Sequence, residues 1–363
     1  MSRRRKIQFA QLLFVMVAWV VAAFLIAAYD YFLVNAHEIH ASPSQYYSFW
    51  SDLIVNVYGA FVATLTAGSL FVFYLNVKFI NKPYGYSILM NCLTYIVIVI
   101  TVTAIGGLFW VPYSTGIQVG ESGFGQAYKY FLSDSYHLNN ILIWSIVVAL
   151  TQFVLLMNNK FGHGILWDIL RGKYHLSRKE TRIFMFADLN DSTTIAEKLG
   201  DERYHDLLKD FFADVTNPII NRKGDIYQYI GDEIIVVWEY ENGISGNNCV
   251  QCFFDMKKVI EDNSQRYLSK FGLLPEFKAG IHFGKVIAGE IGIMKRDITF
   301  SGNVLNTTSR IENKCKEFKV DLIASDELLS QLSFGDQFIL QPLGNIKLRG
   351  KEKEMGLSTL LAR

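Results

Sequence analysis

Cysteine is scarce in this chain of 363 residues, which contains only four. Cys92 falls inside an apolar run, whereas Cys249, Cys252 and Cys315 lie in the more polar half, so a disulfide framework is not expected. Cys249 and Cys252 form a C-x-x-C pair, but no second pair is present to complete a zinc site. Because a spacing of three residues is ordinary in a helix core, we interpret both as packing residues.

Net charge is also nearly absent, since 35 basic residues are balanced by 34 acidic residues for a total of +1. A balance of this kind argues against broad electrostatic attraction to nucleic acid, and no nucleic-acid partner is expected. The chain is longer than one hydrophobic core usually is, and 51% of its residues are apolar. At least two structural parts are therefore predicted.

Charged residues are missing from four long apolar stretches, at residues 7–29, 53–77, 86–112 and 139–157. A bilayer core requires about 20 such residues in a helix, so these stretches predict a four-helix transmembrane domain over residues 1–160, with the lipid bilayer as partner. Buried core helices are the alternative, and four uncharged runs in succession disfavour it. The first run follows a basic N-terminus as a signal peptide does, but it is longer than the usual apolar region of a signal peptide.

The basic residues between the spans indicate an orientation. Four of them precede the first span, none occurs from Asp30 to Asp52, and Lys78 and Lys82 follow the second span. Six more follow the fourth span from Lys160 to Arg182, so the positive-inside rule places both termini on the cytoplasmic side of the cell (inner) membrane. Spans without ionisable groups argue against an ion pathway, and an anchor or sensor is the better interpretation.

The second half has mixed charge, with an expected cytoplasmic linker at residues 161–180 and a folded domain at 181–363. A buried strand is predicted from Arg182 to Asp188, followed by a helix over 190–199 that Asp191 or Ser192 caps and Gly200 ends. Apolar residues at helical spacing predict a second helix over 203–220. Further helices are expected near 250–270 and 303–316, and strands at 225–230, 233–240, 277–283 and 286–290. The result is an α+β domain with a mainly antiparallel sheet.

Two carboxylates are predicted at the ends of these strands. Asp188 closes the first strand, and Asp232 lies in a tight Gly231-Asp232 hairpin turn. Mg²⁺ prefers oxygen ligands, typically one or two carboxylates together with substrate phosphates. A Gly-Asp pair is first of all a turn, however, so the spacing alone does not establish a metal site.

Three motifs carry a resemblance to a known family. F-A-D-L-N-D-S-T at 186–193, Y-I-G-D-E at 229–233 and G-N-V-L-N-T-T-S-R at 302–310 resemble the class III adenylate/guanylate cyclase family, in its membrane-anchored bacterial type. The resemblance covers roughly residues 181–363 and implies a ferredoxin-like core. It also implies that two bound ions, Mg²⁺ or Mn²⁺, help to convert a nucleoside triphosphate into the 3′,5′-cyclic mononucleotide and pyrophosphate.

The resemblance also implies roles for individual residues. Asp188 and Asp232 correspond to the two metal aspartates, and the main-chain carbonyl of Leu189 would contact metal as well. Asn306 would orient the ribose and Arg310 would neutralise the α-phosphate. The phosphate-binding residues would be Asn190, Asp191, Ser192 and Thr193 at a helix start and, in the L-R-G-K turn at 348–351, Arg349 and Lys351. The family builds each site from two protomers, so a homodimer is implied.

The base-recognition positions depart from the family pattern. Gln228 stands where the family has an adenine-reading lysine, while Thr299 matches a common adenylate variant. A glutamine amide both donates and accepts, so ATP is favoured while GTP and a pyrimidine triphosphate stay open. Both residues are also compatible with ordinary solvent-facing strand positions. His282, in an apolar strand, is interpreted as a satisfied core residue and not as a base.

Two other functions remain open from the sequence. The G-D-E turn resembles the signature of diguanylate cyclases, although the helix with Asn306 and Arg310 fits the class III pattern better. The second alternative is a membrane receptor whose cyclase-like domain binds nucleotide and is catalytically silent. Gln228 leaves room for that reading, whereas the intact aspartates speak against it.

Overall fold

The computed structural model describes residues 3–36, 49–79, 82–161, 168, 171–294, 296–335 and 337–363. The chain divides into two compact units, one over Arg5–His163 and the other over Gly164–Arg363. Most of the first half of the expected linker lies outside the described residues.

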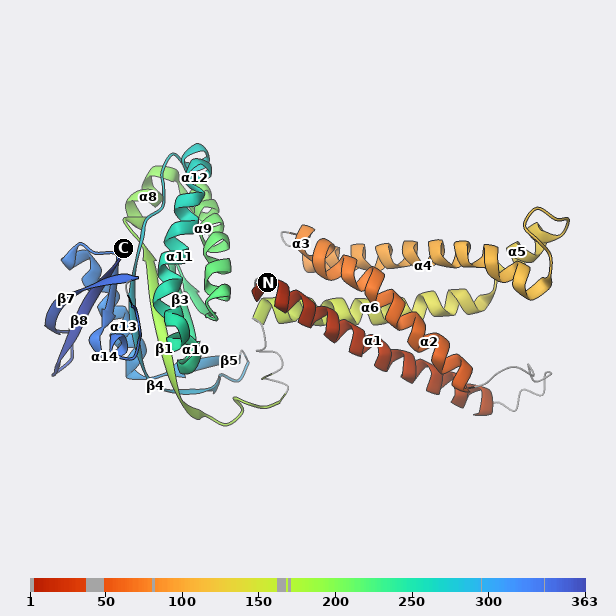
Figure 1. Ribbon diagram of the computed structural model, residues 1–363, viewed down its shortest axis with the longest axis horizontal. Coiled ribbons are helices and arrows are strands. Elements are labelled where there is room, and N and C mark those ends of the chain that lie inside the picture. The colour runs from red at the N-terminus through yellow and green to blue at the C-terminus, as the bar shows by residue number, and fades with distance from the viewer. Residues whose placement is uncertain are drawn as a thin grey trace. The chain divides into compact units, whose positions relative to one another are not determined.

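The N-terminal unit is helical (Figure 1). Four of its helical stretches are long and apolar enough to cross a membrane, namely Arg5–Phe32, Asn56–Lys78, Tyr84–Thr115 and Asn139–Asn158. They coincide with the four uncharged stretches of the sequence. The elements are α1 (Arg3–Ala36), α2 (Phe49–Ala63), the π-helical η1 (Thr64–Gly68) and η2 (Phe71–Leu75), α3 (Asn76–Lys78), α4 (Tyr84–Thr115), α5 (Phe124–Leu132) and α6 (Ser135–Phe161).

Polar side chains link these helices to one another. The indole of Trp19 donates to Thr151 Oγ1 at 3.1 Å, and its ring packs edge-on against Tyr95. Asn91 of α4 donates to Asn76 Oδ1 at 3.2 Å. Apolar burial contributes little to helix association in lipid, so such bonds and close packing hold a bundle together.

The C-terminal unit contains an eight-stranded sheet among its described residues, in the order β2-β3-β1-β4-β6-β8-β7, with β5 paired to β4. All pairs are antiparallel except β4 with β6. The predicted α+β class with a mainly antiparallel sheet is therefore confirmed. The strands are β1 (Arg178–Leu189), β2 (Asp225–Ile230), β3 (Glu233–Glu239), β4 (Phe277–Ile291), β5 (Asp297–Ser301), β6 (Leu322–Ser325), β7 (Phe338–Lys347) and β8 (Glu354–Ala362).

The two faces of the sheet bear different helices (Figure 1). Met185 of β1 points into the core formed with α9 (Asp201–Asn221) and α11 (Asn248–Asp262), whereas its neighbour Phe184 faces Val304 of α13 (Asn303–Phe318). Successive strand residues point to opposite faces, so β1 contributes to both cores. The remaining helices are α8 (Ser192–Leu199), α10 (Tyr240–Ile244), the 3-10 turn η3 (Ser245–Asn247), α12 (Ser264–Phe271) and α14 (Asp326–Leu329).

Two predicted elements differ from the structure. The single helix expected near 250–270 is two helices, α11 and α12, because the chain leaves helical geometry at Asn263, whose side-chain amide donates to Val259 O at 2.8 Å. The two strands expected at 277–283 and 286–290 form one continuous strand of 15 residues, β4. Gly284 makes no turn between them. A Cβ there would lie 3.2 Å from Val304, so the glycine admits α13 instead.

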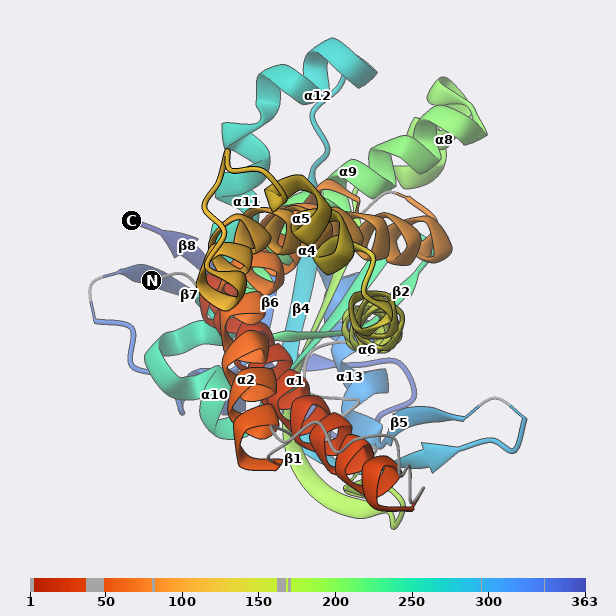
Figure 2. The ribbon, with the colours of Figure 1, turned by 90° about the vertical axis from the view of Figure 1, so that its right-hand side faces the viewer.

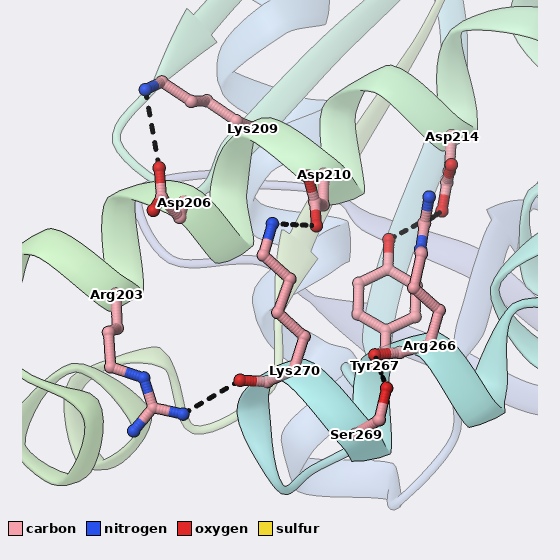
Figure 3. Close-up of polar contacts among 9 residues, drawn as sticks. All are labelled: Arg203, Asp206, Lys209, Asp210, Asp214, Arg266, Tyr267, Ser269 and Lys270. Atoms are coloured by element: carbon pink, nitrogen blue, oxygen red, sulfur yellow. Dashed lines mark hydrogen bonds and ion pairs between the residues drawn. The ribbon is translucent and has the colours of Figure 1, made fainter.

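Polar contacts fasten α12 to α9 (Figure 3). Lys270 pairs with Asp210 at 2.8 Å, and the hydroxyl of Tyr267 donates to Asp214 at 2.8 Å. Arg203 reaches back from α9 to the carbonyl of Lys270 at 2.9 Å. These bonds fix the short α12 after the break at Asn263.

Candidate functional site

Asp188 and Asp232 are brought together by the pairing of β1 with β3, in which Ala187 lies opposite Ile234. Asp188 is the penultimate residue of β1, and Asp232 lies in the two-residue turn that joins β2 to β3. Gly231 has a φ of 63° in this turn, which favours glycine. The strand register therefore places both carboxyl groups at the same end of the sheet. Burial raises the pKa of Asp188, the bond from Lys278 lowers it, and the adjacent Asp232 raises it further.

Two neighbouring carboxylates suit a hard divalent cation, because their mutual repulsion is relieved when a cation binds both. Leu189, the last residue of β1, follows directly. In the described parts of the chain, no group of three or more His, Cys, Asp or Glu side chains is arranged to hold a metal. The donor set fits Mg²⁺ or Mn²⁺ with substrate oxygens completing the shell, and it does not resemble an all-protein cage.

The turn after β1 opens the helix α8. Asp191 adopts the left-handed conformation with a φ of 51° and accepts the first helical bond, from Ile195 N at 3.0 Å, but its side chain caps no amide. The amides of Ser192 and Thr193 are in the first turn, where no intrahelical acceptor exists. The Asn190 amide, in contrast, already donates to Glu276 O at 2.8 Å. Only part of the predicted phosphate loop therefore has amides free for an anion.

A second group of predicted residues gathers at α13. Asn306 is exposed and Arg310 is half-buried, one turn further along the same helix. A Cβ on Gly350 would lie 3.4 Å from the Arg310 guanidinium, so the turn at 348–351 rests against this side chain. Burial and then the charge of Arg310 lower the pKa of Lys351. In the described part of this unit neither cation has a carboxylate at ion-pair distance, which leaves the positive charge available to a polyanion.

The base-recognition candidates lie beside a linked aromatic pair. The hydroxyl of Tyr227 in β2 accepts a hydrogen bond from Phe300 N at 3.3 Å, and the two rings are 5.1 Å apart. Gln228 follows Tyr227 at a bulge and is exposed, while Thr299 precedes Phe300. Thr299 Oγ1 is buried and has no hydrogen-bond partner among the described residues, although buried hydroxyls normally have one.

Three charged residues beside Asp188 were missed in the sequence analysis. Lys278 of β4 lies 2.7 Å from Asp188 and 2.8 Å from Glu312 of α13. Burial lowers the pKa of Lys278, but its bonds to Asp188 and Glu312 outweigh this and raise it to about 12. Burial and then the charge of Glu312 and Asp188 raise the pKa of Glu233 to about 7. A glutamate in the otherwise uncharged buried stripe of α13 is a signal that could have revealed Glu312.

The remaining singled-out residues pack in the core. His282 is buried and bonds Ser325 Oγ at 2.8 Å, and burial lowers its pKa to about 4, so its interpretation as a satisfied core residue is confirmed. Cys249 and Cys252 are buried, free thiols on α11, as expected of packing residues.

Comparisons with known proteins agree with this geometry. Residues 175–359 match the family model described as the adenylate and guanylate cyclase catalytic domain. Adenylate cyclase 2 of Rhizobium meliloti (strain 1021) is 30% identical over 224 residues, which cover 61% of this chain and 62% of that protein. The adenylate cyclase of Anabaena cylindrica is 25% identical over 177 residues, or 48% of this chain and 35% of that protein.

A solved structure shares the fold. A bacterial light-regulated adenylyl cyclase superposes with a TM-score of 0.53 at 19% identity, covering 63% of this chain and 66% of that chain. The present chain thus spans less than two thirds of the length of the curated relatives that it matches.

Proposed function

Because the chain belongs to the family of adenylate and guanylate cyclase catalytic domains, we propose that it is a membrane-bound nucleotidyl cyclase. It converts a nucleoside triphosphate, ATP in the first instance, into the 3′,5′-cyclic mononucleotide and pyrophosphate. The observation that carries this proposal is the adjacency of Asp188 and Asp232 at one sheet end, in a unit that also holds the unneutralised cations Arg310 and Lys351.

The reaction requires the ribose 3′-oxygen to attack the α-phosphorus in line with the leaving pyrophosphate. Two Mg²⁺ or Mn²⁺ ions held by Asp188, Asp232 and the carbonyl of Leu189 would acidify the attacking hydroxyl and neutralise the triphosphate. Asn306 orients the ribose, and Arg310 stabilises the charge that develops on the α-phosphate. Most of the rate enhancement then comes from positioning and charge stabilisation.

The terminal phosphates are bound by basic side chains and by backbone amides. Arg349 and Lys351 supply the side-chain charge from the turn at 348–351. Ser192 and Thr193 supply free amides at the start of α8, where the helix dipole favours anions. Asn190 and Asp191 shape this turn more than they bind, since the Asn190 amide already bonds Glu276.

The active assembly is a homodimer with two shared sites. Among the described residues, Asp188 pairs with Lys278, and no ion pair joins Arg310 or Lys351 to Asp188 or Asp232. A second protomer would bring the cations of one chain to the aspartates of the other. A monomer would then be inactive.

Base selection falls to Gln228 and Thr299. The unpartnered, buried Thr299 Oγ1 supports a ligand contact, because a buried hydroxyl without a partner is unfavourable. Matching relatives named adenylate cyclases favour ATP. Gln228 leaves the discrimination against guanine and pyrimidines weaker than a fixed lysine would make it.

In this proposal the enzyme is a multi-pass protein of the cell (inner) membrane, which the four apolar helices support. Basic residues at the N-terminus and after the fourth span support a cytoplasmic location for both termini and for the catalytic domain (181–363). The transmembrane domain (1–160) serves as anchor or sensor, and residues 161–180 connect it to the catalytic domain.

The test is a nucleobase-resolved assay. The full-length protein, in detergent or liposomes, is supplied with ATP, GTP, CTP or UTP and with Mg²⁺ or Mn²⁺, and cyclic products are identified by mass spectrometry. We expect cyclic AMP as the main product, with no turnover in excess chelator. Nucleotide binding without turnover of any triphosphate would instead identify a catalytically silent receptor.

A further inference from the structure

Three buried oxygen atoms of the N-terminal unit have no hydrogen-bond partner among the described residues. They are Asn91 Oδ1, Ser145 Oγ and Gln152 Oε1. Asn91 and Gln152 are almost wholly enclosed, with 0% and 1% of their surface exposed. An unpaired polar group is unfavourable in any protein interior and more so within a membrane, where no bulk water replaces the missing bond. Buried polar atoms without a partner therefore indicate a site that a ligand completes.

Other hydroxyl groups of the same unit are satisfied by their own helices. Those of Thr64, Thr94 and Thr151 each donate to the carbonyl four residues earlier, at 2.7 to 2.8 Å. This bond is the usual one for a hydroxyl in a membrane-spanning helix. Ser145 makes no such bond within the described part of the chain, so its hydroxyl is left for another partner.

The three unpartnered oxygens lie on two helices, α4 and α6, that pack against each other (Figure 1). Cys92 Sγ is 3.8 Å from Ser145 O, and the ammonium of Lys160 lies 6.0 Å from the centre of the Tyr84 ring. These two contacts show that the helices run antiparallel. They also bound the stretch of each helix to which all three oxygens belong, so the oxygens share one level of the bundle.

Helix geometry directs these side chains toward one another. Ser145 and Gln152 are seven residues apart, which is close to two turns, so both lie on the same face of α6. Side chains on a helix lean toward its N-terminus, and this brings the long Gln152 side chain back toward Ser145. Asn91 is next to Cys92, which contacts the carbonyl of Ser145. Its amide nitrogen donates to Asn76 Oδ1 at 3.2 Å, which fixes the direction of the unpaired oxygen.

The chemistry of the three atoms indicates which ligand fits. All are oxygens of uncharged side chains, and they require a hydrogen-bond donor or a cation. The spans Tyr84–Thr115 and Asn139–Asn158 contain no Asp or Glu, so a divalent cation would lack the carboxylates that it prefers. Neutral oxygens suit a monovalent cation instead. Because both carboxamides are already enclosed by protein, the ligand must also be small.

We propose that Asn91, Ser145 and Gln152 form a binding site for a monovalent cation, Na⁺ or K⁺, between α4 and α6. The site does not depend on the proposed cyclisation, because all of its residues belong to the N-terminal unit. It is compatible with the argument against an ion pathway, since neutral oxygens can hold an ion without conducting it. A bound cation would supply the input that a sensor requires.

The test uses the full-length protein in detergent, with choline chloride to keep the ionic strength constant. Equilibrium dialysis with radioactive Na⁺, and with radioactive Rb⁺ in place of K⁺, measures the affinity for each ion, and thermal unfolding measures stability. Gln152→Leu removes one unpaired oxygen at similar volume, and Ser145→Ala removes another. Thr94→Val is the matched control, because it removes a hydroxyl that is already bonded within α4.

We expect saturable binding of Na⁺, Rb⁺ or both to the wild type, and an affinity at least about tenfold lower in Gln152→Leu. Ser145→Ala should also bind more weakly, whereas Thr94→Val should bind like the wild type. In choline chloride, Gln152→Leu should unfold at a higher temperature than the wild type, because it no longer buries an unpaired amide. The bound cation should then stabilise the wild type and not Gln152→Leu.

Two results would overturn the proposal. If neither ion binds saturably, the three oxygens are satisfied in another way, for example by buried water. If Gln152→Leu binds the ion as the wild type does and is less stable in every salt, Gln152 only joins helices. Neither measurement needs turnover, so the site is tested even if the protein cyclises no triphosphate and the proposed function fails.

Discussion

Asp188 and Asp232 place two like charges side by side, an arrangement that is unfavourable until a cation joins them. Lys278 offsets part of this repulsion, and bound ions would offset the rest. Active-site residues commonly lower stability in exchange for function. Removing one of the two charges should therefore lower activity without lowering stability.

We predict that Asp232→Asn lowers turnover by at least about 100-fold, because an amide is a poorer ligand for a hard cation. The metal-free variant should unfold at the same temperature as the wild type or a higher one, since one source of repulsion is gone. Asp206→Asn, which changes an exposed ion pair on α9, serves as the control and should leave kcat unchanged. Wild-type turnover in Asp232→Asn would remove Asp232 from the metal site.

The acidic cluster also makes stability depend on pH. The folded-state pKa of Glu233 is raised from 4.5 to about 7 by burial and neighbouring negative charge. A raised carboxyl pKa means that the folded state holds its proton longer than the unfolded state does. The stability that the protonated Glu233 allows is therefore fully present below the pKa of the unfolded state. It is lost as the pH rises through the pKa of the folded state.

In excess chelator we expect the unfolding temperature of the wild-type chain to fall between about pH 4.5 and pH 7 more than that of Glu233→Gln does. Added Mn²⁺ should reduce this difference by neutralising the cluster. The unfolding temperature is measured by tryptophan fluorescence, to which the buried Trp238 contributes. Identical pH profiles for the two proteins would contradict the shift assigned to Glu233.

We propose that base selectivity depends on Gln228. Gln228→Lys restores the residue type of the class III adenine-reading position, so we expect the ratio of kcat/KM for ATP over GTP to rise by about tenfold. Gln228→Ala should lower discrimination between bases without changing metal dependence. Competing-substrate assays measure both ratios, and an unchanged ratio in both variants would exclude Gln228 from base recognition.

At the level of elements, the contact between α13 and β4 fixes the position of Asn306 and Arg310. Gly280 lies under α13, where a Cβ would be 2.4 Å from a backbone atom, whereas at Gly284 of the same strand it would be 3.2 Å from the side chain of Val304. The backbone of α13 can move less easily than the side chain of Val304 when a methyl group is added to the strand.

Gly280→Ala should therefore lower the unfolding free energy by about 1–3 kcal/mol and reduce kcat, because α13 is displaced. Gly284→Ala should cost less, since Val304 can adjust. Chemical denaturation and turnover are measured on both proteins. Equal stability of the two variants would mean that α13 does not depend on the Gly280 contact.

The sequence predicted those elements whose signal is local. The Gly231-Asp232 hairpin and the amphipathic α13 follow from turn chemistry and periodicity, and both are present. The prediction of one helix near 250–270 and of two strands at 277–283 and 286–290 was wrong, because the break at Asn263 and the continuity of β4 depend on a tertiary context that overrides local propensity. Lys278 was missed for a similar reason, since its place opposite Asp188 depends on strand register.

At the scale of the whole molecule, the proposed homodimer explains why no ion pair joins Asp188 and Asp232 to Arg310 and Lys351 within the described part of one unit. The β4–β5 hairpin extends away from the rest of the unit (Figure 2) and exposes Ile293 and Met294 almost completely. The homodimer and the membrane orientation remain predictions. The α+β fold and the four apolar helices are established.

Complementation between inactive protomers tests the central claim most directly. Asp188→Ala and Arg310→Ala chains carrying different tags are expressed separately and together, and cyclic nucleotide production is measured on the doubly purified mixed dimers. Each homodimer should be inactive, and the mixed dimer should show about half of the wild-type rate, because one of its two shared sites contains both intact halves. An inactive mixed dimer, formed from protomers that each still fold and bind to one another, would contradict the account.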